Sequence, residues 1–194
     1  IFYLADYVLQ MNAILLIAFL FGPLILGVPL TTVIRRRLGV AGAQQLLLLL
    51  AGVALLLVVV VPASLIPFCL ALAGFGLAGP QTLTNVLFAQ VADEDELRSG
   101  VRREGAFFGV NALLTKPAQS LALALMPFVL EATRFVTREA NQGQMLLDQP
   151  ASALFGIRVL VGLVPGLAML LGAVILRWYP LRGAYLERIK EELL

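Results

Sequence analysis

The segment QVADEDELRSGVRREGAFFGVNALLTKPAQS, from Gln90 to Ser120, organises the rest of this chain. It begins with a short burst of charge and continues as an apolar segment that contains one lysine, Lys116. The sequence on both sides is close to uncharged hydrocarbon. An ammonium group inside such a run costs several kcal/mol unless another group pairs with it. Lys116 is therefore the residue whose position most needs an explanation.

The composition places the chain in a lipid bilayer. Hydrophobic residues make up 60% of the 194 residues and charged residues 13%, whereas a soluble domain is roughly 45–50% apolar. One cysteine and no histidine leave the usual zinc sites, haem sites and histidine bases without their residues. The basic residues gather at the ends of apolar runs and not in a stripe, which argues against a nucleic-acid partner. We therefore expect a membrane protein without a catalytic or metal site.

The apolar runs predict an all-α membrane bundle over residues 1–180, followed by a cytoplasmic tail over 181–194. A helix of about 20 residues crosses a hydrocarbon core of ~30 Å. The first residues lack an initiator methionine and read as the end of a helix already under way, so we expect a fragment whose first span is truncated. The predicted spans cover 1–9, 12–34, 43–61, 65–92, 105–130 and 151–179.

Two of these spans carry a specific expectation. The span 43–61 has no polar residue after Gln45 and is expected to face lipid. The span 65–92 contains GFGLAG at Gly74 to Gly79, which matches the spacing of a dinucleotide-binding loop but lacks a preceding strand. Small residues that let helices approach closely are the better interpretation.

The basic residues also predict the orientation of the spans. They occupy every second connection and the C-terminus, which we therefore place in the cytoplasm, with the other connections outside. The protein is then a multi-pass protein of the plasma (cell inner) membrane. The basic residues concerned are Arg35, Arg36, Arg37, Arg98, Arg102, Arg103, Arg177, Arg182, Arg188 and Lys190.

The span 105–130 is amphipathic at membrane depth. At about 100° per residue, its polar side chains fall within one half of the helix and its apolar side chains within the other. A polar half inside a membrane turns toward protein or water. We therefore predict a path for substrate and cation near the bilayer midplane, formed by Asn111, Thr115, Lys116 and Gln119 together with Gln81 and Asn85 of the preceding span.

Lys116 could instead pair with a carboxylate as a packing device. The complete spans carry no carboxylate at its depth, because Glu104 and Glu131 lie at the two ends of its own helix. We therefore expect its partner to be missing from this fragment and its role to be functional. Arg158, a second intramembrane cation, is expected to reach Glu131.

The charged connection before this span is expected to be a cytoplasmic loop. A solvated turn would explain it, but its alternating charges also permit ion pairs that form in one conformation and break in another. The predicted gating residues of this loop are Asp93, Asp95, Arg102, Arg103 and Glu104.

The C-terminal tail reads as a short amphipathic helix. Leu186, Ile189 and Leu193 fall on one face, and charged residues cover much of the rest. This pattern suits a helix that lies on a membrane surface, and a solvated tail is the alternative.

These features together resemble a known family. DELRSGVRREG at 95–105, a lysine twelve positions after Glu104, GIRVLVGLVPGL at 156–167 and WYPLRGAYLERIKEEL at 178–193 are similar to the C-terminal half of the glycoside-pentoside-hexuronide:cation symporters. These are the melibiose-permease-like branch of the major facilitator superfamily. The resemblance implies twelve spans in two halves, with substrate and cation bound between them. It also implies that Lys116 approaches an acidic cation site contributed by the other half.

We therefore predict a secondary transporter that couples a small solute, a sugar or glycoside, to Na⁺ or H⁺ by alternating access. No cofactor is expected beyond the coupling ion. The expected partners are the lipid bilayer, the missing N-terminal half and the small-molecule substrate. Two alternatives stay open: a carrier of lysolipid-like or other amphiphilic substrates, and a non-transporting membrane scaffold. Enzyme activity is not expected.

Overall fold

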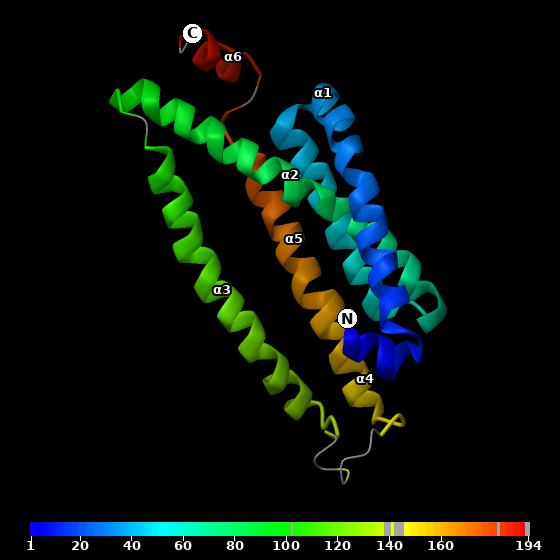
Figure 1. The fold of residues 1–194 in the computed structure, drawn as a ribbon. Coiled ribbons are helices and arrows are strands. Elements are labelled where there is room, and N and C mark those ends of the chain that lie inside the picture. Colours follow the sequence, from blue (N-terminus) through cyan, green and yellow to red (C-terminus); the bar gives the residue numbers. More distant parts are fainter. Residues whose placement is uncertain (102, 138–140, 142–145, 182, 193–194) are drawn as a thin grey trace.

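The computed structural model describes residues 1–101, 103–137, 141, 146–181 and 183–192, and these residues form helices and no strand (Figure 1). Four helical segments are long and apolar enough to cross a membrane: Ala13–Val60, Ala63–Ser99, Glu104–Ala132 and Ala151–Trp178. The elements in chain order are η1 (Leu4–Leu9), α1 (Ala13–Val60), η2 (Ala63–Leu65), α2 (Ile66–Ser99), α3 (Glu104–Ala132), α4 (Ala151–Arg158), η3 (Val159–Leu163), α5 (Val164–Ile175), η4 (Leu176–Trp178) and α6 (Gly183–Glu192).

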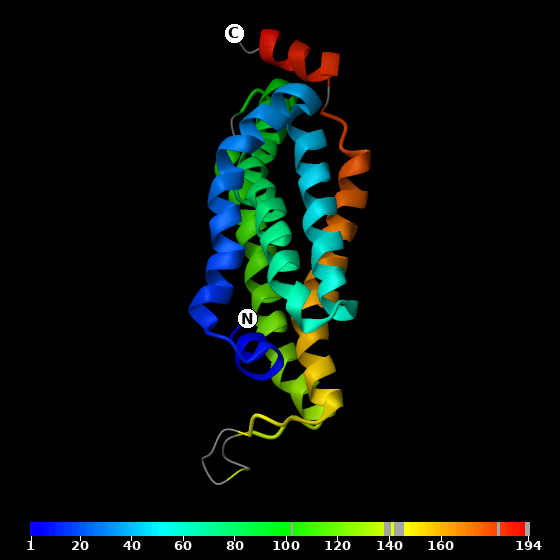
Figure 2. The same cartoon turned by 90° about the vertical axis from the view of Figure 1, so that its right-hand side faces the viewer.

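Helix α1 is a helical hairpin and not one straight rod. Its 48 residues would span about 72 Å if straight, more than twice a hydrocarbon core of ~30 Å. The chain instead turns at Gly39, whose φ of 71° and ψ of 173° are accessible to glycine and to few other residues. The two arms then run side by side (Figures 1 and 2). They correspond to the spans predicted at 12–34 and 43–61.

The α1 hairpin packs against α2 through small residues. A Cβ atom added to Gly74 would lie 1.9 Å from the carbonyl oxygen of Leu20, and one added to Gly76 would lie 2.6 Å from the backbone nitrogen of Ala51. Both glycines lie inside helix α2. The close-approach interpretation of GFGLAG is therefore confirmed, and the dinucleotide interpretation is excluded for this segment.

The expectation that residues 43–61 face lipid is wrong for one face of this arm, whereas Leu46, Val53 and Val60 on its other face are exposed. Ala43, Leu47, Ala51 and Val58 are at most 1% exposed, because this arm lies between α2 and the rod formed by α4 to η4. Gly52 meets that rod closely, since a Cβ there would lie 2.8 Å from the side chain of Leu170. Lipid and a protein interface are equally apolar, so a run of alanine and leucine does not reveal which one it contacts.

Helix α3 stands apart from the rest of the bundle (Figure 1). It meets its neighbours near its two ends, and Leu130 is the only buried residue along its length. At one end the rings of Phe88 and Phe108 lie 5.9 Å apart. At the other end Phe135, just beyond α3, packs edge-on against Tyr7 with ring centroids 5.0 Å apart.

Helix α6 lies across the end of the bundle that holds the α1 bend (Figure 2). Leu181, just before the helix, and Ile189 within it are 2% and 4% exposed. The hydroxyl group of Tyr185 donates to Glu94 Oε1 at 2.9 Å, which ties α6 to α2. Ile189 is therefore buried and Leu186 half-buried against the protein, unlike in the membrane-surface helix or solvated tail that the pattern suggested, while Leu193 lies outside the described residues. An amphipathic pattern does not distinguish these surfaces.

Candidate functional site

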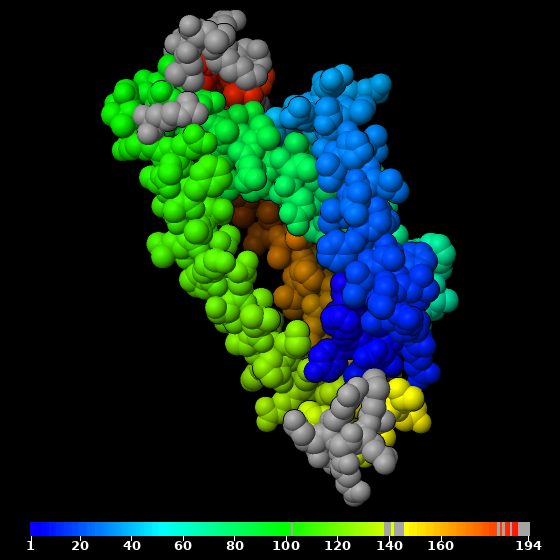
Figure 3. Space-filling view, in the orientation of Figure 1, coloured from blue at the N-terminus to red at the C-terminus, as the bar shows by residue number. Residues whose placement is uncertain are grey.

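A groove lies between α3 and the remaining helices. Figure 3 shows it as a hollow beside α3, with α5 at its floor. Within the groove is an apolar cavity of about 530 Å³. Its lining comes from the N-terminal residue and from α1, α2, α3, η3 and α5: Ile1, Leu20, Leu55, Leu70, Leu77, Ala122, Leu125, Met126, Leu160, Val161, Val164, Pro165, Ala168 and Met169.

The face of α3 that lines this cavity continues into the polar stripe predicted from the sequence. At about 100° per residue, Ala122, Leu125 and Met126 lie within about 60° of the direction of Asn111. Asn111 is half-buried, as are Leu125 and Val129 on the same face. Thr115 and Gln119 lie about 40° and 80° from Asn111. These three polar residues therefore share the groove-facing side of α3.

The helical register of α2 places Gln81 on the side of that helix that faces α3. On α2, Gln81 lies one turn beyond Leu77, which lines the cavity, and about 20° from the direction of Phe88, which contacts Phe108 of α3. Asn111 and Thr115 occupy the corresponding interval on α3, between Phe108 and the cavity. By this register, polar side chains of the two helices follow the apolar cavity along the groove. Gln81 and Asn85 are both exposed.

Lys116 lies on the flank of this arrangement. It is about 140° around α3 from Asn111, and its side chain is exposed. No ion pair joins it to any carboxylate in the described part of the chain. Pro117, the next residue, lacks the N–H that would bind the carbonyl of Leu113. The helical register thus places Asn111, Thr115 and Gln119 on the side of α3 that lines the cavity and Lys116 on its flank, and a shared path with Gln81 and Asn85 stays a prediction.

The sequence reasoning missed a group of polar side chains buried between α1 and α2. Thr82 Oγ1 donates to the carbonyl of Ala78 at 2.7 Å and lies 3.4 Å from Thr31 Oγ1. Gln44 Nε2 donates to Thr84 Oγ1 at 3.3 Å. Gln44 is 4% exposed, and its Oε1 atom has no hydrogen-bond partner in the described structure. The signal for this buried group in the sequence is Gln44 near the start of an apolar arm. A glutamine at that position is equally compatible with the end of a lipid-facing span, so the sequence does not reveal the burial.

The charged connection is a helix for most of its length and not a loop. Helix α2 continues beyond the predicted end at Ala92 to Ser99, where Gly100 adopts the left-handed conformation that ends many helices. Asp93 and Asp95 are therefore helical. The pair Glu94 and Arg98, with atoms 2.5 Å apart, adds support at spacing i,i+4.

A bidentate ion pair joins the end of α2 to the residue that precedes α3. Arg103 donates to the two carboxylate oxygens of Asp95 at 2.9 and 3.0 Å. Glu104 begins α3, where a negative charge interacts favourably with the helix dipole. Arg102, the remaining predicted gating residue, lies outside the described residues.

Arg158 binds backbone carbonyls and not Glu131. Its Nη1 atom donates to the carbonyl oxygen of Val61 at 2.9 Å and lies 3.5 Å from that of Val59. Helix α1 ends at Val60, so the guanidinium group satisfies carbonyls that the helix end leaves unpaired. Carbonyl acceptors of this kind cannot be read from side-chain identities, which is why the sequence pointed to the nearest carboxylate.

Among the described residues, no group of three or more histidine, cysteine, aspartate or glutamate residues is placed to hold a metal ion.

A family model described as MFS/sugar transport protein matches residues 1–183. The chain is 35% identical over 121 residues to an uncharacterized symporter of Synechocystis sp., an alignment that covers 62% of this chain and 22% of that protein. It is 26% identical over 133 residues to a glucuronide carrier protein homolog of Escherichia coli, with 69% and 27% covered. The matched segments thus span about a quarter of the length of these relatives. No solved structure matches.

Proposed function

Because the chain belongs to the MFS/sugar transport protein family, we propose that it is part of a cation-coupled symporter for a sugar or glycoside. Membership of this family and the name of the first relative support a multi-pass membrane transporter over an enzyme or a scaffold. The two relatives are named as a symporter and as a glucuronide carrier homolog, which supports a carbohydrate-like solute. The proposed coupling ion is Na⁺ or H⁺.

The polar stripe of α3, on the side of the helix that also lines the cavity, is the observation that supports this proposal. Asn111, Thr115 and Gln119 of α3 and Gln81 of α2 supply neutral donors and acceptors, which suit the hydroxyl groups of a sugar. Neutral groups also allow release, since a carrier must let its solute go on the other side of the membrane. Asn85, near Gln81 on α2, extends the proposed path toward the end of α2.

The proposed architecture is the C-terminal six-span half of a twelve-span carrier. The two arms of α1, α2, α3 and the rod from α4 to η4 would supply five spans, and η1 would be the end of a truncated first span. In this arrangement the solute binds between the two halves, and each half tilts to open one side at a time. The other half is the proposed partner of the α3 face that carries Lys116.

Lys116 is proposed to balance a carboxylate charge when the coupling cation leaves. Its exposed side chain on the flank of α3 supports a partner outside the described residues. An intramembrane ammonium is costly when isolated, so pairing with an acidic cation site would stabilise the empty carrier as it reorients. The solute itself would not need to contact Lys116.

The proposed carrier lies in the plasma membrane with the α1 bend and α6 on the cytoplasmic side. Arg35, Arg36 and Arg37 lie at the bend, and Arg98 and Arg103 lie at the same end of the bundle. This distribution supports the orientation through the positive-inside rule. Asp95 and Arg103 then form a cytoplasmic ion pair that joins α2 to α3.

The test is uptake of labelled glucuronide and melibiose by cells that express the full-length protein with Lys116→Ala or Lys116→Arg. We expect Lys116→Ala to abolish accumulation against a gradient while solute binding persists, and we expect Lys116→Arg to retain part of it because the charge remains. Uptake driven by an imposed Na⁺ gradient or by an imposed pH gradient identifies the cation. Normal coupled uptake by Lys116→Ala would contradict the proposal.

The apolar section of the groove favours a second candidate, a carrier of amphiphilic substrates. Its cavity of about 530 Å³ has no polar side chain among its lining residues, which suits an acyl chain better than a sugar. Competition decides between the two. Lysophospholipid that displaces the labelled solute at lower concentration than free sugar would support the amphiphile carrier, and the reverse order would support the sugar symporter.

A further inference from the structure

A second cavity lies where the α1 bend, the last turns of α2 and the start of α6 meet. Its volume is about 580 Å³. Arg35 and Arg36 line one part of it, and Gln90 and Asp93 line another. Leu186 of α6 contributes to an apolar part of the wall. The transport proposal makes no use of this cavity, which is separated from the α3 groove by the body of α2.

The two arginines in this cavity differ from those at the end of α2. Arg98 and Arg103 pair with Glu94 and Asp95. Within the described ranges, neither Arg35 nor Arg36 forms an ion pair or a side-chain hydrogen bond. Two adjacent guanidinium groups repel each other and offer many N–H donors in a fixed fork geometry. A bound phosphate group would offset the repulsion between the two charges and accept hydrogen bonds from the N–H groups, because arginine binds phosphate through paired, charge-assisted hydrogen bonds.

The position of the cavity along the membrane normal suits a lipid headgroup. The first arm of α1 is free of charge from Ala13 to Ile34, and the arginines follow directly. That arm is about 33 Å long, the thickness of a hydrocarbon core, so the arginines fall at the level of the headgroups. Basic pockets between helices at this level bind anionic headgroups. The apolar part of the wall can accept the glycerol and the first acyl carbons.

We propose that this cavity binds the phosphate group of an anionic phospholipid through Arg35 and Arg36. Since the apolar part of the wall, to which Leu186 contributes, can accept the glycerol and first acyl carbons of a lipid, the cavity favours a lipid phosphodiester over soluble phosphate. Because α6 forms part of the wall, the lipid also holds α6 against the bundle.

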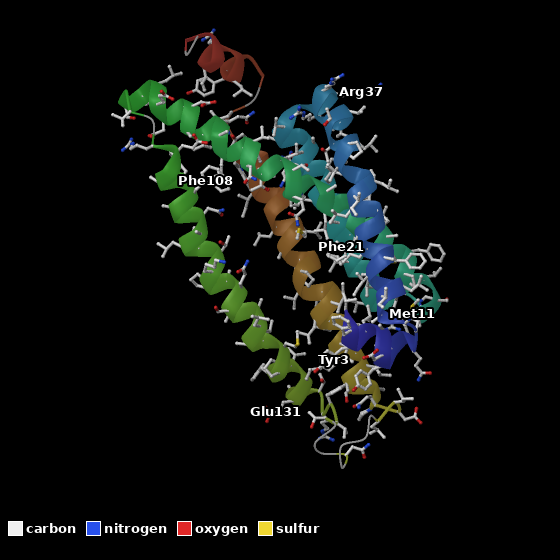
Figure 4. The ribbon with its side chains drawn as sticks, viewed as in Figure 1. Tyr3, Met11, Phe21, Arg37, Phe108 and Glu131 are labelled. Atoms are coloured by element: carbon white, nitrogen blue, oxygen red, sulfur yellow. The ribbon has the colours of Figure 1, made fainter. Side chains whose placement is uncertain are left out.

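Arg37 provides the matched control. It is the next residue in the sequence, has the same charge and is exposed, but it is absent from the cavity lining. Figure 4 shows it at the outer tip of the α1 bend. If lipid binding depended only on general surface charge, substitution of any of the three arginines would weaken it equally. If it depends on the cavity, only substitution of Arg35 or Arg36 weakens it.

The experiment measures lipid binding to the full-length carrier by native mass spectrometry in a neutral detergent. The probes are phosphatidylglycerol, phosphatidylcholine and soluble glycerol phosphate, and the variants are Arg35→Gln, Arg36→Gln and Arg37→Gln. We expect each of the first two to weaken binding of phosphatidylglycerol roughly tenfold, the effect of one lost hydrogen bond between charged groups. Arg37→Gln should change it less than about twofold, as expected for a screened surface charge.

Three results would overturn the proposal. One is an equal loss in Arg37→Gln, which would indicate general surface attraction. Another is wild-type binding of phosphatidylcholine as tight as that of phosphatidylglycerol. The third is displacement of the lipid by equimolar glycerol phosphate, which would indicate a site for a soluble phosphate. Arg35→Lys is the control for misfolding, because it keeps the charge and should retain partial lipid binding. Its thermal unfolding should match that of the wild type.

Discussion

The contact between Gly74 of α2 and Leu20 of α1 yields a quantitative prediction. A Cβ atom at position 74 would lie 1.9 Å from the carbonyl oxygen of Leu20, whereas a comfortable contact between a carbon and an oxygen is about 3.3 to 3.6 Å. The obstacle is backbone, so no side chain can rotate away from it. Gly74→Ala therefore forces the first arm of α1 and α2 apart by more than an ångström.

We expect Gly74→Ala to lower the free energy of unfolding by about 1 to 3 kcal/mol, the usual cost of one methyl group too many in a tightly packed interface. The control is Gly22→Ala, in the same arm of α1. A Cβ there meets nothing within 4 Å. Alanine is a better helix former than glycine by roughly 0.5 to 1 kcal/mol, so Gly22→Ala should leave the stability unchanged or raise it.

The assay is unfolding of the full-length protein in mild detergent, followed by the loss of helical circular dichroism with increasing dodecyl sulfate. The comparison between the two variants removes the common effect of a glycine-to-alanine change. If Gly74→Ala unfolded at the same dodecyl sulfate fraction as Gly22→Ala, the close approach of the helices would not limit the packing. The argument that GFGLAG serves helix packing would then fail.

Two further predictions concern the charged groups. Arg158→Gln should lower the free energy of unfolding by about 1 to 3 kcal/mol, because the carbonyl of Val61 loses its charged donor. The control Arg177→Gln removes an exposed arginine and should have little effect. Equal stabilities of the two variants would contradict the capping role of Arg158. A double-mutant cycle with Asp95→Asn and Arg103→Gln should give a coupling of about 1 kcal/mol or less that shrinks at high salt, since both side chains are partly exposed. A salt-independent coupling would show that the pair is buried in the working carrier.

The polar stripe of α3 shows how far the sequence reaches toward the site. The spacing of Asn111, Thr115 and Gln119 is enough to define one side of a helix, because side chains about four residues apart share a face. The same arithmetic groups Lys116 with that half of the helix. It does not say which part of the arc faces the groove, and the direction set by Ala122 and Leu125 separates Lys116 from the others.

The arm from Val40 to Val60 shows where sequence reasoning failed. Its residues predict the correct helix, but hydropathy assigns the whole arm to lipid although one of its faces packs between α2 and α5. The buried Gln44, whose Nε2 donates to Thr84, and the carbonyl partners of Arg158 were missed for a related reason. Backbone groups and the identity of a neighbouring helix do not appear in the side-chain pattern of one segment.

The helical character of this protein, the lengths of helices that suit a membrane and the positions of the charged residues can all be predicted from the amino-acid sequence. These properties are local, since every backbone polar group in a bilayer must be satisfied within its own helix. The three-dimensional fold adds which apolar face contacts protein, where α3 leaves a groove and which of the described arginines lie away from a carboxylate. Those properties depend on contacts between distant segments, and the apolar side chains of one segment do not specify whether they will contact lipid or another helix.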